Sequence, residues 1–238
     1  MNNNMYINEN NRSSIKRKII ENPLCCVYPW AIQFVLDNIK ILPPKSVILE
    51  IGTFVGGTTR LFAQANPDIK IHTIDIDGFG NTDLNPEFGP INTNQMVLFA
   101  KETFGLLDIT AEDLYEIRKM HLEDLPYVIS HSGNSRDLQL QELDLVFIDA
   151  SHRYPEVIAD LRYAWAATKE GGYIFGDDVQ SPAVYNALCK FCQEVDVPYT
   201  IYSKCFKIRK KTRQCPDLQR QKNIISRKLY ETCFVDFR

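Results

Sequence analysis

The sequence predicts an α/β fold: a doubly wound, mostly parallel seven-stranded sheet with helices on both faces and an antiparallel edge strand. Two observations predict it. Short apolar runs alternate with stretches of helical periodicity along most of the chain, and the last two runs are joined too tightly for a crossover helix. The length of 238 residues suits one domain that buries a whole parallel sheet.

The first half of the chain supplies two strand-helix units. Apolar residues at helical spacing predict a helix over 28–39, which ends before two consecutive prolines. A strand over 46–51 then enters a glycine-rich turn, and the helix after it, at about 58–65, ends at an Asn-Pro pair. The next strand is expected over 69–75.

The second half supplies three further strands with their helices and a hairpin. Pro155 suits the first position of a helix, and the pair Gly171-Gly172 is expected to end that helix. The expected elements, in chain order, are strands 127–131 and 143–149, a helix at about 155–168, strand 173–177, a helix at about 182–194, and hairpin strands 198–203 and 205–209.

Three segments depart from this alternation. Residues 1–14 are rich in asparagine and predict a disordered tail, and 210–238 form a basic C-terminal extension. Between them, the domain proper covers 15–209. It contains an insert, 78–126, that is longer than one crossover helix needs.

The insert combines a loop rich in Gly, Asn and Pro with two helix-like stretches, near 93–104 and 110–123. Loops at the carboxyl ends of parallel strands face the ligand crevice. We therefore interpret the loop that begins at Gly78 as a lid or substrate-recognition element. A pair of dimerisation helices is the alternative.

Charge is unevenly distributed along the chain. The net charge is −3, yet residues 204–238 hold 11 Lys and Arg against 3 Asp and Glu, a net charge of +8. Such a basic end on an acidic body suits an anionic partner, while a solvated surface is the simpler interpretation.

The sequence has the features expected of a cytoplasmic protein. The first 18 residues contain no apolar segment typical of an export signal, and no run is long and apolar enough to span a membrane. The seven cysteines are therefore expected to be reduced thiols. Cys189 and Cys192 have the spacing of a redox or zinc half-site, but their position within a predicted helix favours a coincidence of helix spacing.

The most informative stretch is ILEIGTFVGGTT, residues 48–59. Its strand enters a turn that contains Gly52, Gly56 and Gly57, where the absence of Cβ atoms lets a ligand approach the backbone. Asp75, which ends the next strand, can accept hydrogen bonds from both hydroxyls of a ribose. Together these features predict a nucleoside site of the Rossmann-like type.

The glycine spacing distinguishes between nucleosides. Dinucleotide sites follow G-x-G-x-x-G, whereas this chain has G-x-x-x-G-G preceded by Glu50. The pattern favours S-adenosylmethionine (SAM), whose amino acid and sulfonium groups need room and a nearby carboxylate. A dinucleotide site and a plain turn with loop glycines are the alternatives.

Acidic residues follow two later strands. Asp149 ends the fourth strand with His152 three residues on, and Asp177 and Asp178 end the fifth. Neighbouring parallel strands open on one side, so the carboxylates should converge beside the SAM pocket and repel one another unless a cation lies among them. We therefore predict Mg²⁺ or another divalent ion there, with His152 as a base. Alternatively, the aspartates cap a helix and border the cofactor.

On these residues the chain resembles the class I SAM-dependent methyltransferases, and among them the cation-dependent O-methyltransferases of catechols, caffeoyl-CoA and macrolide sugars. The resemblance covers roughly 46–209, and it implies that Ser135, within GNSRD, lies beside the adenine. It implies the following SAM-binding residues: Glu50, Gly52, Gly56, Gly57, Thr58, Asp75, Ser135 and Asp149. It further implies catalysis by Asp149 and His152 and a metal held by Asp149, Asp177 and Asp178.

Two features depart from that family. Asp178 replaces an asparagine, which adds a negative charge, and the insert 78–126 has no counterpart from which acceptor contacts can be carried over.

The expected activity is methyl transfer from SAM to a hydroxyl of a small molecule, since a chelating metal needs two adjacent oxygens, as in a vicinal diol, a phenol or a sugar. A nucleic-acid methyltransferase that uses the basic extension, and a non-catalytic SAM-binding protein, are the alternatives. A homo-oligomer is compatible with the sequence, and no membrane partner is expected.

Overall fold

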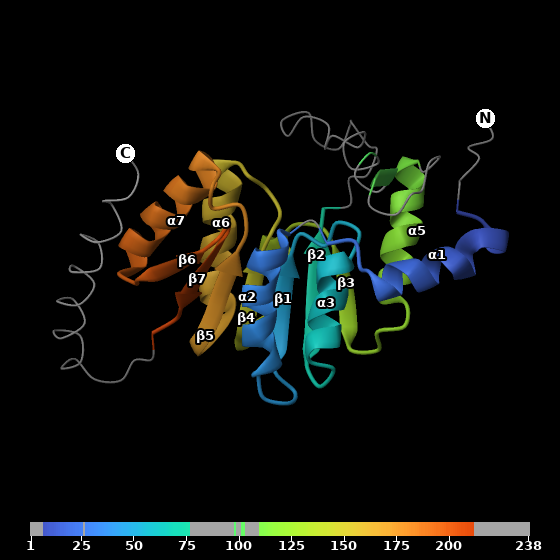
Figure 1. The fold of residues 1–238 in the computed structure, drawn as a ribbon. Coiled ribbons are helices and arrows are strands. Elements are labelled where there is room, and N and C mark those ends of the chain that lie inside the picture. The colour runs from blue at the N-terminus through green and yellow to red at the C-terminus, as the bar shows by residue number, and fades with distance from the viewer. Residues whose placement is uncertain (1–6, 26, 77–97, 99–100, 103–109, 212–238) are drawn as a thin grey trace.

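The computed structural model describes residues 7–25, 27–76, 98, 101–102 and 110–211. These residues form one seven-stranded sheet in the order β3-β2-β1-β4-β5-β7-β6 (Figure 1). The strands are β1 (Val47–Ile51), β2 (Lys70–Asp75), β3 (Val128–Ser132), β4 (Leu143–Ile148), β5 (Thr168–Gly176), β6 (Tyr199–Tyr202) and β7 (Cys205–Arg209).

The sheet has the predicted mixed character. The pairs β1 with β2, β1 with β4, β2 with β3 and β4 with β5 are parallel. Strand β7 runs antiparallel to β5, and the hairpin brings β6 back along its outer side. The predicted fold class is therefore confirmed, with the antiparallel strand one position in from the edge.

Helices cover both faces of the sheet. The helices are α1 (Glu9–Glu21), α2 (Pro29–Lys40), α3 (Gly57–Ala65), α5 (Ala111–Leu122), the short 3₁₀ helix η1 (Ser135–Asp137), α6 (Tyr154–Ala167) and α7 (Pro182–Val195). Helices α2 and α3 pack on one face, α6 and α7 on the other, and α1 and α5 lie together beyond α3 (Figure 1).

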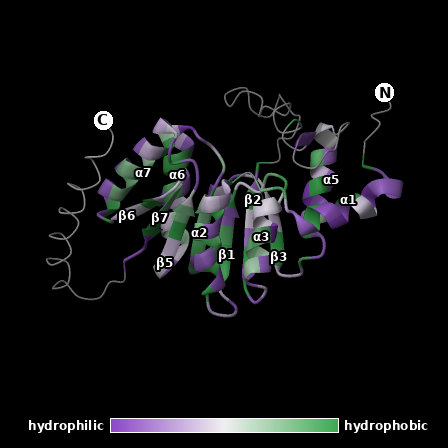
Figure 2. Ribbon diagram, viewed as in Figure 1, coloured by the Kyte–Doolittle hydropathy of each residue, from purple (hydrophilic) through white to green (hydrophobic). Residues whose placement is uncertain are grey.

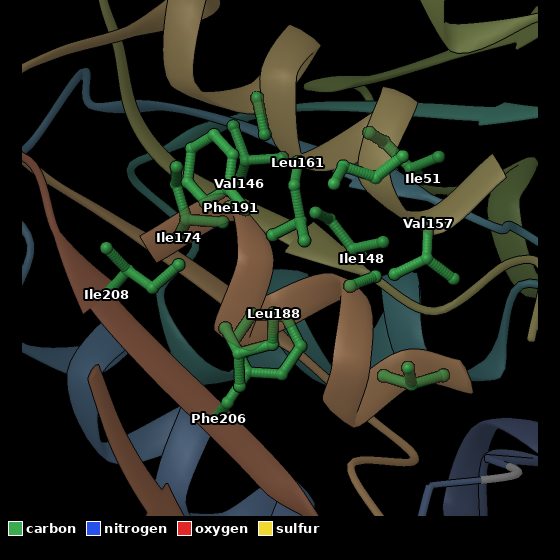
Figure 3. Close-up of a cluster of buried hydrophobic side chains, with 14 of the residues drawn as sticks. Ile51, Val146, Ile148, Val157, Leu161, Ile174, Leu188, Phe191, Phe206 and Ile208 are labelled. Atoms are coloured by element: carbon green, nitrogen blue, oxygen red, sulfur yellow. The ribbon is translucent and has the colours of Figure 1, made fainter. Parts of the chain in front are cut away.

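The central strands are apolar on both faces because both are covered. Figure 2 shows this hydrophobic colouring along the strands and the mixed colouring of the helices. One core lies between the sheet and the helices α6 and α7, where side chains such as Ile148, Leu161 and Phe191 meet (Figure 3). The second lies under α2 and α3 and contains Phe62 and Phe147, whose rings meet edge to face. Burial on both faces fixes the register of the strands that carry the site.

The pair Gly171-Gly172 differs from its predicted role. We expected it to end a helix before a strand at 173, but β5 already begins at Thr168, directly after α6. The register of β4 with β5 shifts here, so the glycines form an irregularity within the strand. An added Cβ at Gly172 would lie 3.0 Å from the carbonyl oxygen of Asp144, which explains why a glycine suits this position.

The N-terminal segment is a correction to the sequence prediction. The disordered tail predicted for 1–14 is wrong for 7–14, because α1 begins at Glu9 behind a capping box of Asn8. The asparagine-rich composition concealed an apolar stripe of α1. Its residues Ile15 and Ile19 are buried against α5.

Within the insert, α5 corresponds to the stretch predicted near 110–123. Most of the stretch near 93–104 lies outside the described residues, as does the loop that begins at Gly78. The C-terminal extension is described only to residue 211. Among the described helices, none combines the length and apolarity that a bilayer crossing requires.

The burial of α1 generates a stability prediction. Ile15→Ala should lower the free energy of unfolding by about 2–4 kcal/mol, because a side chain that is 4% exposed is removed from a packed cluster. Ser14→Ala, at an exposed neighbouring position, should change it by less than about 0.5 kcal/mol. Urea unfolding of both variants measures the difference. Equal midpoints for the two variants would contradict the docking of α1.

Candidate active site

The carboxyl ends of four parallel strands meet at one edge of the sheet. Ladder hydrogen bonds continue past the strand ends, since the amides of Gly52, Asp149 and Asp177 donate to the carbonyl oxygens of Ile74, Ile51 and Ile148 at 2.8–3.0 Å. The residues that follow β1, β4 and β5 are therefore held side by side. This edge gathers the two predicted groups of functional residues.

The glycine turn after β1 is packed against the protein's own backbone. A Cβ at Gly52, where φ is +105°, would lie 1.9 Å from the carbonyl oxygen of Asp149. A Cβ at Gly57 would lie 1.8 Å from the carbonyl oxygen of Leu24. Gly56 also has a positive φ, +79°. Backbone packing at Gly52 and Gly57 and the left-handed conformation of Gly56 therefore favour glycine, whatever ligand approaches them.

Glu50 is a buried carboxyl within β1. Its Oε2 accepts hydrogen bonds from the hydroxyls of Thr59 and Thr73, the latter at 2.6 Å. Its Oε1 is buried and has no hydrogen-bond partner among the described residues. Burial, partly offset by the threonine hydroxyls, raises the pKa of Glu50 to about 8. A cationic donor placed at Oε1 would satisfy the oxygen and favour the charged form.

Asp75 ends β2 and faces the glycine turn. Its Oδ2 accepts the backbone N–H of Phe54 at 2.6 Å and lies 3.4 Å from Nη2 of Arg118. Its side chain is 17% exposed, so the carboxylate lies at the boundary between the fold and solvent.

Two further predicted cofactor residues have hydroxyls that are already engaged. Ser135, in η1, is 5% exposed and donates to Asp160 of α6 at 2.6 Å. Thr58 is buried in the first turn of α3, with its Oγ1 3.2 Å from the Sγ of Cys25. Either residue can border a ligand, but its hydroxyl already makes a contact within the protein.

The second group of residues follows β4 and β5. Among the described residues, Asp149, His152 and Asp178 form one cluster, in which one ligand atom from each lies within 4.8 Å of the others. His152 Nε2 is 2.6 Å from Oδ2 of Asp178. Asp177 is outside this cluster, although it lines the same small pocket as Asp149 and His152. Its side chain is buried, at 7% exposure, and Sγ of Cys205 lies 3.5 Å from its Oδ1. The structure thus brings His152, in place of the predicted Asp177, within ligand distance of Asp149 and Asp178.

The electrostatics of this cluster favour a cation. Burial raises the pKa of Asp149 to about 7, and the charges of Asp177 and Asp178 add to the shift. Burial also raises the pKa of Asp177. The pKa values of His152 and Asp178 shift in opposite directions. The hydrogen bond between the two side chains raises the pKa of the imidazole and lowers the pKa of the carboxyl. Oxygen and nitrogen donors in this arrangement suit a divalent ion.

The cysteine pair is not part of this chemistry. Cys192 is buried in the core under α7, and Cys189 Sγ lies 3.4 Å from the hydroxyl of Tyr199. Neither belongs to a metal-binding cluster of the described residues. The helix-spacing interpretation agrees with these positions.

Two residues of α5 contact the glycine turn and were not identified from the sequence. Nε of Arg118 donates to the carbonyl oxygen of Phe54, and Nδ1 of His121 lies 2.7 Å from that of Val55. Both residues share the buried face of the helix with Leu114 and Ile117. An arginine and a histidine at the spacing of the buried apolar residues of this helix were the sequence signal that could have identified these contacts.

Comparison with known proteins gives a consistent result. The model of the family described as "Methyltransferase domain" matches residues 49–179, which include both groups of functional residues. An uncharacterized protein of Acanthamoeba polyphaga mimivirus is 28% identical over 151 residues, which is 62% of this chain and 59% of that protein. The chain therefore spans less than two thirds of the length of this relative.

Solved structures share the fold at low identity. A proposed caffeoyl-CoA O-methyltransferase from Staphylococcus aureus aligns with a TM-score of 0.51 and 16% identity, over 83% of this chain and 91% of that chain. The O-methyltransferase TomG from Streptomyces achromogenes, involved in tomaymycin synthesis and solved with SAM, aligns with a TM-score of 0.50 and 16% identity, over 87% and 91%. A SAM-dependent O-methyltransferase from Thermotoga maritima aligns with a TM-score of 0.50 and 14% identity, over 84% and 72%.

The raised pKa of Glu50 predicts how stability depends on pH. Between its ordinary pKa of 4.5 and about 8, the folded protein keeps a proton that the unfolded chain has released. The free energy of unfolding should therefore fall as pH rises through this range, with Asp149 acting in the same direction. Glu50→Gln should flatten the dependence by on the order of a few kcal/mol between pH 5 and 8.5. Urea unfolding at several pH values measures it. Parallel profiles for the two proteins would contradict a buried, protonated Glu50.

Proposed function

The chain belongs to the methyltransferase-domain family, and on this premise we propose that it is a SAM-dependent O-methyltransferase acting on a small molecule with two adjacent hydroxyls. The observation that carries the proposal is the meeting of two groups at one sheet edge. Glu50, Gly52 and Asp75 lie at the carboxyl ends of β1 and β2, while Asp149, His152 and Asp178 follow β4 and β5. One group suits a nucleoside with a cationic end, and the other suits an oxygen that must lose a proton.

The residues of the first group fit SAM. Oε1 of Glu50 is a buried acceptor without a partner among the described residues, and such an atom is costly to leave unsatisfied. The ammonium group of a bound amino acid is a suitable donor. Asp75, fixed by the amide of Phe54, is the candidate acceptor for ribose hydroxyls. Bound SAM supplies a methyl group that its sulfonium already activates.

The residues of the second group fit a divalent cation. Asp149 and Asp178 are the candidate ligands, and Asp177 lines the same pocket. The raised pKa values of Asp149 and Asp177 support a site that is short of positive charge. A bound Mg²⁺ or similar ion would hold two neighbouring acceptor oxygens and acidify one of them.

His152 is the candidate general base. Its imidazole is 55% exposed and is oriented by Asp178, whose other oxygen, Oδ1, accepts a hydrogen bond from Gln180 at 2.5 Å. With Nε2–H donating to Asp178, Nδ1 carries the lone pair that takes the proton of the acceptor hydroxyl. The hydrogen bond to Asp178 raises the pKa of His152.

The cofactor assignment predicts a binding result. The protein should bind S-adenosylhomocysteine in calorimetry, and Asp75→Ala should weaken this binding by about tenfold, because ribose hydroxyls lose a charged acceptor. Asp68→Ala, which removes an exposed carboxylate before the opposite end of β2, is the matched control and should bind normally. Binding of NAD in place of S-adenosylhomocysteine would overturn the assignment.

The reaction centre predicts a separation of binding from turnover. His152→Ala should retain S-adenosylhomocysteine binding but lose on the order of 10²–10⁴ in methylation rate, the usual contribution of a positioned base. Arg153→Ala, at the neighbouring position, should retain the rate. Catechols and sugar diols, tested with SAM, provide the acceptor panel. Chelator should abolish turnover and Mg²⁺ should restore it, so full activity in excess chelator would refute the metal assignment.

A further inference from the structure

Helix α5 forms one wall of the glycine turn. Arg118 donates to the carbonyl oxygen of Phe54, and His121 donates to that of Val55. The next residue of the turn, Gly56, faces the side chain of Leu122, since a Cβ there would lie 3.1 Å from Leu122 Cδ2. Two consecutive residues of the turn are therefore held by hydrogen bonds, and the third lies against the same helix, which is more than 60 positions further along the chain.

Arg118 connects this turn to the ribose-binding candidate. Its side chain is 11% exposed, and Nη2 lies 3.4 Å from Oδ2 of Asp75. The same Oδ2 accepts the amide of Phe54 at 2.6 Å. Phe54 thus gives its N–H to the carboxylate and receives the guanidinium at its carbonyl, so the turn, the acid and the helix form a closed set of contacts.

The conformation of Phe54 explains why the turn needs such contacts. Its φ is +46°, a left-handed backbone conformation that is unfavourable for a residue with a bulky side chain. Hydrogen bonds at both the N–H and the carbonyl of Phe54 compensate for this cost. A guanidinium suits the position because its rigid planar fork can address a carbonyl and a carboxylate together, which a lysine cannot do.

Helix α5 is itself firmly anchored. His121 accepts the amide of Leu24 at Nε2 (3.3 Å), and its carbonyl accepts Nη1 of Arg60 at 2.6 Å. Arg60 also pairs with Asp124 through both terminal nitrogens, at 2.8 and 3.1 Å. The apolar residues of α1 complete the packing of α5. A rigid support of this kind lets one side chain of α5 define the position of a loop.

We propose that Arg118 is a positioning residue for the cofactor, which orients Asp75 and the Phe54 peptide so that the ribose end of SAM finds a prearranged acceptor. The inference rests on the proposed function. It adds that helix α5, in the connection between β2 and β3, determines cofactor affinity together with the strand ends. Arg118 acts through Asp75, so its effect should depend on the presence of that carboxylate.

A double-mutant cycle tests this dependence. Arg118→Met should weaken S-adenosylhomocysteine binding by about tenfold, measured by calorimetry on the full chain. In an Asp75→Asn background the same substitution should weaken binding less than about twofold further, because its target is gone. Lys119→Met, on the same helix with a side chain that is 64% exposed, is the control and should bind like the wild type. Additive losses in the cycle would overturn the proposal.

A second variant and a second measurement separate the failure of this inference from the failure of the proposed function. Arg118→Lys keeps the charge without the fork and should bind with intermediate affinity at an unchanged melting temperature. In the ligand-free protein, hydrogen exchange at the Phe54 amide should accelerate in both Arg118 variants but not in Lys119→Met. Unchanged exchange and affinity in Arg118→Lys would refute the positioning role, whereas a wild-type protein that binds no S-adenosylhomocysteine would refute the proposed function and the cofactor role together.

Discussion

The close approach of β1 and β4 at Gly52 is the constraint on which the site depends. A side chain at this position would collide with the carbonyl oxygen of Asp149, so the two strand ends can meet only through a glycine. This contact brings the turn after β1 next to the aspartate after β4, and the parallel register then adds Asp75 on one side and the residues after β5 on the other. The two halves of the candidate site therefore lie together because of backbone packing.

The distribution of charge separates the carboxylates of this edge into two kinds. Asp75 lies beside the guanidinium of Arg118, and Asp178 is hydrogen-bonded to the imidazole of His152. The pKa values of Glu50, Asp149 and Asp177 are raised, with burial as the first cause in each case. Buried acids of this kind lower the stability of the protein as pH rises, and they are retained where a function uses them. A cationic cofactor and a divalent ion are the ligands that would relieve the cost, which ties the pH dependence of stability to the function proposed for the protein.

Helix α1 precedes the family-matched region and supports this site through α5, which lies within that region. Helix α1 packs on α5, α5 holds the glycine turn, and the turn holds Asp75 through the amide of Phe54. Ion pairs of Arg12 and Lys16 with Glu123, each at 2.8 Å, join the two helices at their surface. The N-terminal segment thus contributes to the support of the cofactor site, although residues 49–179 alone match the methyltransferase family.

Local chemistry in the sequence determined most of the fold and the positions of the candidate site. The alternation of apolar runs, the turn around Gly52 and the acids at the strand ends depend on neighbouring residues, and the structure confirms the fold class that they predict. The tertiary structure alone decided the contacts between distant segments. These are the hydrogen bond of Arg118 to Phe54 across 64 positions, the burial of α1, and the presence of His152 in the cluster where Asp177 was predicted. Each of these depends on which helix faces meet and on which side of a strand end a carboxylate points, and no local pattern encodes that information.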